Sequence, residues 1–257
     1  MKFSVLLTGC LLSARLVSSQ PSLVTENDLN ELAASEFLSF SAMKDTSLSE
    51  AAARLQKING RLVAAVRVYA RERRLPQLKT FTWELVLVDK KDINAFCLPG
   101  GRMVIGVPMF RWAQSEAALA AVMAHQLAHV LLGHGEQRLR QALKDMLGGR
   151  RFAELRTSKP ADARDLLLAA YGGGNVALLS AFETEQEKEA DKFGMVLMAI
   201  AGFDPGEAIV FWQRMAYLST GPERPVLLSA HRYAVARKEQ MELEIDPITR
   251  KYYRQTP

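Results

Sequence analysis

The segment from Ser115 to His134 limits the possible fold more than any other part of this 257-residue chain. Its sequence, SEAALAAVMAHQLAHVLLGH, has an apolar stripe and few residues that break helices, so it predicts a long, buried α-helix. Within it, His125 and His129 are four residues apart and lie on one face of such a helix. Two imidazoles on one helical face can bind a single metal ion, which is why zinc hydrolases use this spacing.

The same histidines have a simpler interpretation, as core residues whose nitrogens are satisfied by hydrogen bonds. Against it, the chain has 4 histidines, and three of them, the third being His134, lie within this one segment. A catalytic zinc also needs a third protein ligand and an open position for water. A later acid-rich segment offers five candidates: Glu183, Glu185, Glu187, Glu189 and Asp191. Acidic residues also stabilise the first turn of any helix, so spacing alone does not choose among them.

The remaining pattern predicts an α+β fold that is mostly helical and has a small β-sheet. A capping-box sequence, Ser47 to Glu50, precedes helical spacing that Pro76 ends. Segment 81–89 is predicted as a strand, and 181–205 and 207–217 as helices. Segment 94–107 begins with a polar turn, pivots on Pro99-Gly100-Gly101 and continues as a strand through Val107. We expect a single domain over 47–257, preceded by a tether or loosely packed lead-in over 20–46.

The N-terminus has the layout of an export signal. Residues 1–19 contain Lys2, then the apolar run Phe3–Leu12, then small residues. The sequence LTGC, which ends at Cys10, resembles the lipobox of bacterial lipoproteins, and the alternative is a soluble form cut near 17–20. We therefore expect an exported protein of a bacterial envelope, either periplasmic or held on the membrane surface through lipid on Cys10.

Composition excludes some classes of partner. The chain has 33 basic and 28 acidic residues, and the basic ones are scattered among the acids, so we expect no nucleic-acid partner. Only two cysteines occur, Cys10 and Cys97. If Cys10 is lipidated or removed, Cys97 has no partner and is best interpreted as a small buried apolar side chain.

Three motifs in order resemble one family. HQLAH at 125–129, EKEAD at 187–191 and the upstream turn NAFCLPGG at 94–101 resemble the HtpX/Oma-type zinc endopeptidases, which are gluzincins related to the CAAX prenyl proteases. The similarity runs from about Asn94 to His231, more than half of the chain. It implies a zincin-like metallopeptidase domain with a small sheet beside the active-site helix, one Zn²⁺ per chain, and unfolded or extended polypeptides as substrates.

The resemblance also implies roles for individual residues. His125, His129 and Glu187 match the family's metal ligands, and Asp191 matches the carboxylate that holds a ligand histidine by its far ring nitrogen. LLSAH at 227–231 resembles the family's LSTHP, which implies that His231 is an oxyanion donor or occasional fourth ligand. Arg232 stands where the family has proline, and Glu183-Thr184 stands where many relatives have Ser-Arg.

The resemblance extends to the expected substrate site. Asn94 stands where the family keeps an asparagine. LPGGRMVIGV matches the strand beside the active-site helix, whose edge accepts an extended substrate by strand addition. This implies that Met103, Val104 and Ile105 form the substrate strand.

Gln126 stands where the family has its catalytic glutamate. A carboxylate takes a proton from water and passes it on, whereas a neutral amide cannot. The missing group is worth roughly 10²–10⁴ in rate, while metal binding should be unaffected because this residue is not a ligand. We expect a zinc metalloendopeptidase, weakened or inactivated by Gln126, that acts on misfolded or misassembled envelope proteins. The alternative is a non-catalytic zinc protein that holds peptides or client proteins.

Overall fold

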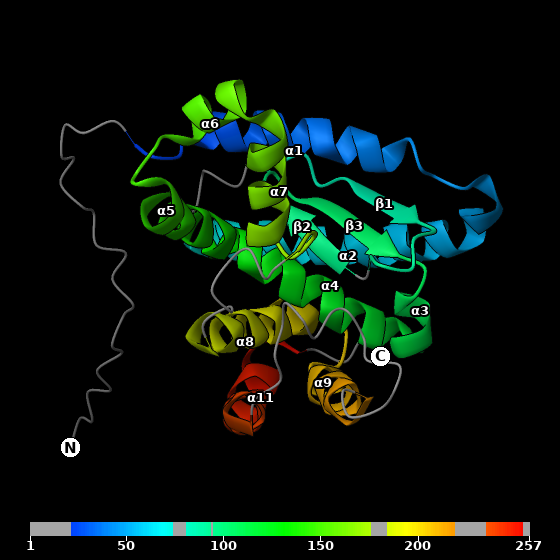
Figure 1. Ribbon diagram of the computed structural model, residues 1–257. Coiled ribbons are helices and arrows are strands. Elements are labelled where there is room, and N and C mark those ends of the chain that lie inside the picture. The colour runs from blue at the N-terminus through cyan, green and yellow to red at the C-terminus, as the bar shows by residue number, and fades with distance from the viewer. Residues whose placement is uncertain (1–21, 74–80, 94, 176–183, 219–234, 254–257) are drawn as a thin grey trace, which may run out of the picture.

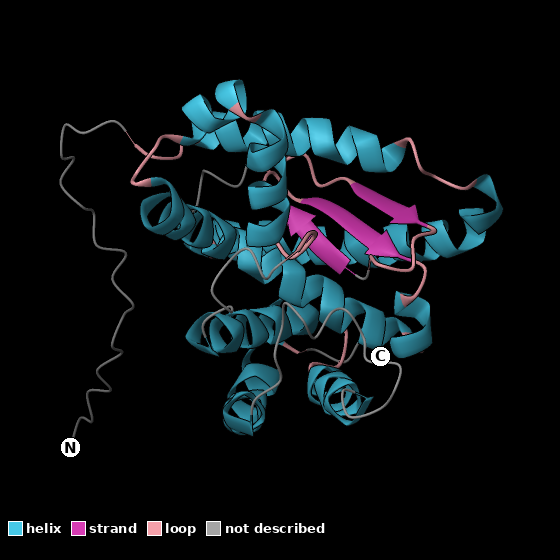
Figure 2. Cartoon of the chain, in the orientation of Figure 1, coloured by secondary structure: helices cyan, strands magenta, loops and turns pink. Residues whose placement is uncertain are grey.

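The computed structural model describes residues 22–73, 81–93, 95–175, 184–218 and 235–253 (Figures 1 and 2). The elements lie in this order along the chain: α1 Glu26–Ser41, η1 Thr46–Leu48, α2 Ser49–Arg73, β1 Leu85–Val88, β2 Ala95–Leu98, β3 Arg102–Gly106, α3 Met109–Trp112, α4 Glu116–Leu131, α5 His134–Leu147, α6 Phe152–Ser158, α7 Pro160–Ala170, α8 Thr184–Ile200, α9 Gly206–Leu218 and α11 Val235–Tyr252. The expected α+β fold, mostly helical with a small sheet, is confirmed.

The three strands form one mixed sheet in the order β1-β3-β2. β1 pairs with β3 in parallel, with Leu85 opposite Met103, and β2 pairs with β3 antiparallel, with Phe96 opposite Val104. The turn between β2 and β3 uses Gly100 and Gly101, both at positive φ, where a side chain would be strained. β3 is therefore the central strand, and β1 and β2 are the two edges.

Helices cover both faces of the sheet, which is why its strands read as apolar runs without alternation. On one face, side chains such as Leu87 and Met103 pack in one core cluster with α2, α4 and α8. On the other face, Val86 and Val104 pack with α1, α5 and α7. Figure 1 shows α4 beside β2, with α8 next to α4 and the pair α9 and α11 beyond α8.

The lead-in expected over 20–46 contains a packed helix. Thr25 is the N-cap of α1, because its side chain accepts a hydrogen bond from the backbone N–H of Asp28. Phe37 and Phe40 are buried in the second core, where Phe40 meets Phe96 edge to face at 5.4 Å between ring centroids. The tether interpretation is wrong for these residues: the polar residues of this segment cover one face of a helix whose other face is apolar.

Two other details differ from expectation. α2 begins at Ser49 after the short 3₁₀ turn η1, and the backbone N–H of Ser47 bonds to the Asp45 carboxylate, so Ser47 does not begin the helix. Among the described residues, no single helix is long and apolar enough to cross a membrane. Only α4 and α5 taken together meet that test, and they are bent by 54°.

Candidate metal centre

The expected metal-binding helix forms as α4. Ser115 is its N-cap and accepts a hydrogen bond from the backbone of Ala118, which starts the helix where the sequence predicts. Small and apolar side chains surround α4 on almost every side, so His125 and His129 are 1% and 5% exposed. Their Nε2 atoms are 3.0 Å apart. Two buried imidazole nitrogens at this distance can act as two ligands of one metal ion.

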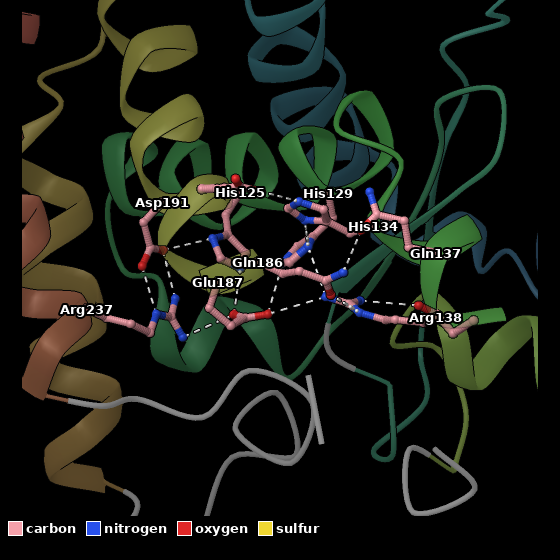
Figure 3. A network of polar contacts seen from close by, with 11 residues as sticks. His125, His129, His134, Gln137, Arg138, Gln186, Glu187, Asp191 and Arg237 are labelled. Atoms are coloured by element: carbon pink, nitrogen blue, oxygen red, sulfur yellow. Dashed lines mark hydrogen bonds and ion pairs between the residues drawn. The ribbon is translucent and has the colours of Figure 1, made fainter. Parts of the chain in front are cut away.

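Glu187 on α8 completes the group. Its carboxylate oxygens lie 3.4 Å from Nε2 of His125 and 3.2 Å from Nε2 of His129 (Figure 3). Four ligands of a tetrahedral zinc ion, at bond lengths of about 2.0–2.2 Å, lie about 3.3–3.6 Å apart. The three separations are close to this range, and these residues could hold a metal ion. The nitrogen and carboxylate donors also suit zinc.

A glycine on α8 lets the two helices come close enough. Gly194 follows Glu187 by seven residues, so both lie on the face of α8 that meets α4. A Cβ at position 194 would lie 3.2 Å from the backbone N of His125 and 3.3 Å from its Cα. The absence of a side chain at Gly194 therefore sets the spacing between the helices at the height of the ligands.

Asp191 and Arg237 lie behind the first histidine. Asp191 Oδ1 is 2.9 Å from Nδ1 of His125, the ring nitrogen on the other side from the one that meets Glu187. Arg237 of α11 is fully buried and donates from Nε and Nη2 to the two oxygens of Asp191, at 2.7 Å each. Its Nη1 is 3.1 Å from Glu187 Oε2. One guanidinium thus holds both carboxylates of α8 in place.

The protonation of the group follows from burial and from these charges. Burial lowers the pKa of His129 well below its ordinary value, so this ring is neutral, as a metal ligand must be. Burial alone would also lower the pKa of His125, but Asp191 and Glu187 beside it outweigh burial and raise that pKa. Burial alone would raise the pKa of Asp191, but Arg237 and His125 outweigh it and lower that pKa, which keeps the carboxylate charged.

His134 supports the second histidine. Gly133, at positive φ, bends the chain between α4 and α5, so that His134 Nδ1 lies 2.9 Å from Nδ1 of His129. His134 Nε2 is 3.1 Å from the exposed carboxylate of Glu189. Burial lowers the pKa of His134, so the ring is neutral, and one of its two nitrogens donates while the other accepts. Nη2 of Arg138 lies 3.2 Å from the same His129 nitrogen.

The other predicted residues have mixed outcomes. Gln126 is buried on α4 between the two histidines in sequence. Asn94 and His231 lie outside the described residues. The substrate-strand role of Met103, Val104 and Ile105 is wrong, because β3 pairs with β1 on one side and β2 on the other. Its main-chain groups are already used, and no edge is left for a substrate.

Two residues of the centre were missed from sequence. Arg237 shares a helical face with the apolar residues Met241 and Ile248, which are also buried. That apolar stripe is the sequence signal for its burial. Arg138 lies on α5, where spacing alone does not mark it. It bonds to Gln186 at 2.8 Å and lies 3.6 Å from Glu187.

Comparison with known proteins agrees with this geometry. The family model for peptidase family M48 matches residues 56–233, more than half of the chain. The chain belongs to peptidase family M48. Its members are zinc-dependent metallopeptidases, and the mostly helical fold with a small sheet fits the zincin-like architecture of this family.

Curated M48 relatives are proteases of bacteria and mitochondria. The chain is 29% identical over 143 residues to the beta-barrel assembly-enhancing protease of Escherichia coli K12, covering 54% of this chain and 29% of the relative. It is 29% identical over 163 residues to the human mitochondrial metalloendopeptidase OMA1, covering 61% and 31%. With the OMA1 of Schizosaccharomyces pombe it is 32% identical over 133 residues, covering 52% and 37%. The chain thus spans about a third of the length of these relatives.

Proposed function

We propose that this M48 protein binds one zinc ion through His125, His129 and Glu187 and is built as a metalloendopeptidase for extended polypeptides. The observation that carries the proposal is the mutual spacing of the three donor atoms, 3.0, 3.2 and 3.4 Å. A zinc ion held by these three residues would supply Lewis acidity, which acidifies water and polarises a substrate carbonyl.

The surrounding residues orient the ligands. Asp191 holds the ring of His125 by its far nitrogen, and His134 does the same for His129. Support of this kind typically changes metal affinity or activity by about 10–100-fold. Trp212 packs edge to face on His125, with 4.9 Å between ring centroids, and also lies under the guanidinium of Arg237 at 4.6 Å. This apolar wall excludes water from the side of the centre that faces α9.

Gln126 limits turnover. Its amide can hold a water or a carbonyl by hydrogen bonds, but it cannot accept a proton and return it to the leaving amine. We infer slow hydrolysis at best, with the centre otherwise intact. A second candidate function follows from the same residue: a protein that keeps the metal and the peptide site but holds clients without cutting them.

For the substrate strand we now favour β2 over β3. β2 has one strand partner among the described residues, and it packs beside α4. An extended chain added at that edge would lie next to the helix that carries His125 and His129, and Asn94 immediately precedes β2. Main-chain pairing of this kind accepts many sequences, which suits a protease of unfolded clients.

We also keep the proposal of an exported protein, periplasmic or anchored through lipid on Cys10, with a signal over 1–19. The test is metabolic labelling with a radioactive fatty acid in a bacterial host. Label that disappears in a Cys10→Ser protein supports the anchor. A protein that is shortened at the N-terminus but carries no label supports simple cleavage, and an unprocessed cytoplasmic protein contradicts export.

The experiment that tests the proposed function compares three proteins: the natural chain, Gln126→Glu and Gln213→Glu. Gln213 is exposed on α9, so its change controls for the added charge. We expect one zinc per chain in all three by elemental analysis. Casein cleavage should rise by roughly 10²–10⁴ in Gln126→Glu alone. No zinc in the natural chain contradicts the metal site. Zinc without cleavage in Gln126→Glu contradicts the peptidase, and peptide capture by that protein would then favour the holding function.

A further inference from the structure

A groove of about 580 Å³ lies at the edge of β1 that has no strand partner among the described residues. β1 and β2 are the opposite edges of the sheet, and α4 lies beside β2 (Figure 1). The groove is therefore at the edge away from the helix that carries His125 and His129. Its walls come from the end of α1, from η1 and the first turns of α2, and from the approach to β1. Among the lining residues are Phe37, Leu48, Ala52, Ala53, Gln56 and Trp83.

The main chain of β1 turns hydrogen-bonding groups towards this groove. The carbonyls of Glu84 and Val88 accept from Met103 and Val107, so both face β3. Successive residues of a strand point their main-chain groups to alternate sides, so the groups of Leu85 and Leu87 face the groove. Among the described residues, the amide of Leu85 and both groups of Leu87 have no partner on that side.

One contact shows which chemistry this edge accepts. The carboxamide of Gln56 donates to the carbonyl of Leu85 at 3.0 Å, across the groove side of the strand. A carboxamide has the same donor and acceptor groups as a peptide bond. The edge of β1 therefore already accepts a hydrogen bond from one amide group of α2. Leu87 is the next residue whose main-chain N–H and C=O face the groove.

The walls suit side chains that alternate about a strand. A chain paired with β1 would turn every second side chain towards Phe37 of α1 and the others towards Leu48 and Ala52. Two apolar side chains on the same end of α1 and just after it are exposed: Leu38 at 68% and Met43 at 43%. β1 has four residues, and four residues of a strand extend about 13 Å. Polar residues such as Lys44, Asp45 and Glu84 also line the groove. The groove is therefore suited to a short, extended segment of polypeptide that has apolar side chains on one face and polar ones on the other.

We propose that the β1 edge is a second polypeptide-binding site, which takes an extended segment of a client with alternating apolar and polar side chains as a fourth strand of the sheet. The proposal rests on the proposed function for its client, an unfolded polypeptide, but not on the metal. The two sites are at opposite edges of one sheet, so one client could be held at β1 while another part of it reaches β2. Holding the client raises its local concentration at the centre.

The test uses a fluorescein-labelled peptide of alternating valine and threonine with a lysine at each end, and fluorescence anisotropy of the full chain. Ala53→Trp puts a large ring into the groove from an exposed position of α2. Ala64→Trp puts the same ring on an exposed position of the same helix outside the groove and is the matched control. A second peptide carries N-methyl groups on alternate residues, which block main-chain pairing but keep the side chains.

We expect Ala53→Trp to weaken peptide binding at least tenfold and Ala64→Trp to leave it unchanged. The N-methylated peptide should also bind at least tenfold more weakly. Binding should persist in Glu187→Gln without zinc, which separates this site from the proposed peptidase. Binding that is lost in Glu187→Gln and unchanged in Ala53→Trp would place the peptide at the metal centre and overturn the proposal. A chain that sediments as a dimer, and becomes monomeric only in Ala53→Trp, would assign the edge to a second copy and overturn it too.

Discussion

Arg237 and Asp191 form a two-pronged ion pair that connects the last helix of the described chain to the candidate metal centre. Both bonds are 2.7 Å long, and both residues are buried. Asp191 in turn lies against His125, so α11 reaches a proposed metal ligand through a single intervening side chain. The C-terminal helix is thus part of the support for the centre, and its removal would take the Arg237 guanidinium away from both buried carboxylates, Asp191 and Glu187.

Arg237→Ala should therefore be strongly destabilising. Breaking one partner of a buried pair costs about 3–5 kcal/mol, because the remaining charge has no compensation. Arg237→Lys should recover part of the stability, since a lysine supplies charge but not the two-pronged geometry. The control is Lys192→Ala, which removes an exposed ion pair to Glu244 between the same two helices and should cost about 0–1 kcal/mol. Urea unfolding measures all three. Equal losses in Arg237→Ala and Lys192→Ala would contradict the buried pair.

Gly194→Ala should weaken zinc binding more than it weakens the fold. The added Cβ would lie 3.2 Å from the backbone of His125, so α8 must move by a few tenths of an ångström. Alanine also favours a helix over glycine by about 0.5–1 kcal/mol, which offsets part of the strain. Gly60→Ala on α2 is the control, because nothing lies within 4 Å of its added Cβ. It should stabilise the protein and leave zinc affinity unchanged. Competition with a zinc indicator checks both, and equal zinc affinities would show that the helix spacing does not matter.

Much of the centre was predictable because helical spacing is a local property. His125 and His129 share a face on any straight helix, and so do Glu187 and Asp191, wherever their two helices lie in the fold. The choice of Glu187 among several acids came from family resemblance. Periodicity could not make it, since an acidic first turn has a helix-stabilising role of its own.

The rest depends on tertiary structure that spacing does not contain. On a straight helix His134 would lie well beyond His129 along the axis, but the bend at Gly133 returns it to His129. The family resemblance predicts β3 as the substrate strand, but β1 pairs with its other side. Strand order cannot be read from the sequence of a single strand. In α1, the many polar residues make the apolar face hard to recognise from the sequence.

The packing of α1 gives a direct test. Phe40→Ala should cost about 3–5 kcal/mol of unfolding free energy, because it removes a buried ring that contacts Phe96 in the second core. Leu38→Ala is the control on the same helix; its side chain is 68% exposed and should cost almost nothing. Denaturant unfolding at constant m-value measures both. If Phe40→Ala is as mild as Leu38→Ala, the segment is a loose lead-in after all.

Cys97 on β2 gives a test that depends on pH. Burial raises the pKa of its thiol well above the ordinary value, and its side chain is 2% exposed. In a Cys10→Ser protein, iodoacetamide at pH 8 should label native Cys97 far more slowly than the urea-unfolded chain, in which the thiol pKa is about 8.5. Rapid labelling of the native protein would show that β2 is not buried as described.

The same thiol also makes stability depend on pH, with a definite sign. The folded pKa lies above the unfolded one, so above about pH 8.5 the unfolded chain loses its proton while the folded chain keeps it. The unfolded state then binds fewer protons, and the unfolding free energy falls by up to about 1.4 kcal/mol per pH unit from this group. A Cys97→Ala protein lacks this contribution, so its stability should fall less steeply between pH 8.5 and 10. Parallel pH profiles for the two proteins, measured by urea unfolding, would contradict a buried neutral thiol at the edge where we place the substrate.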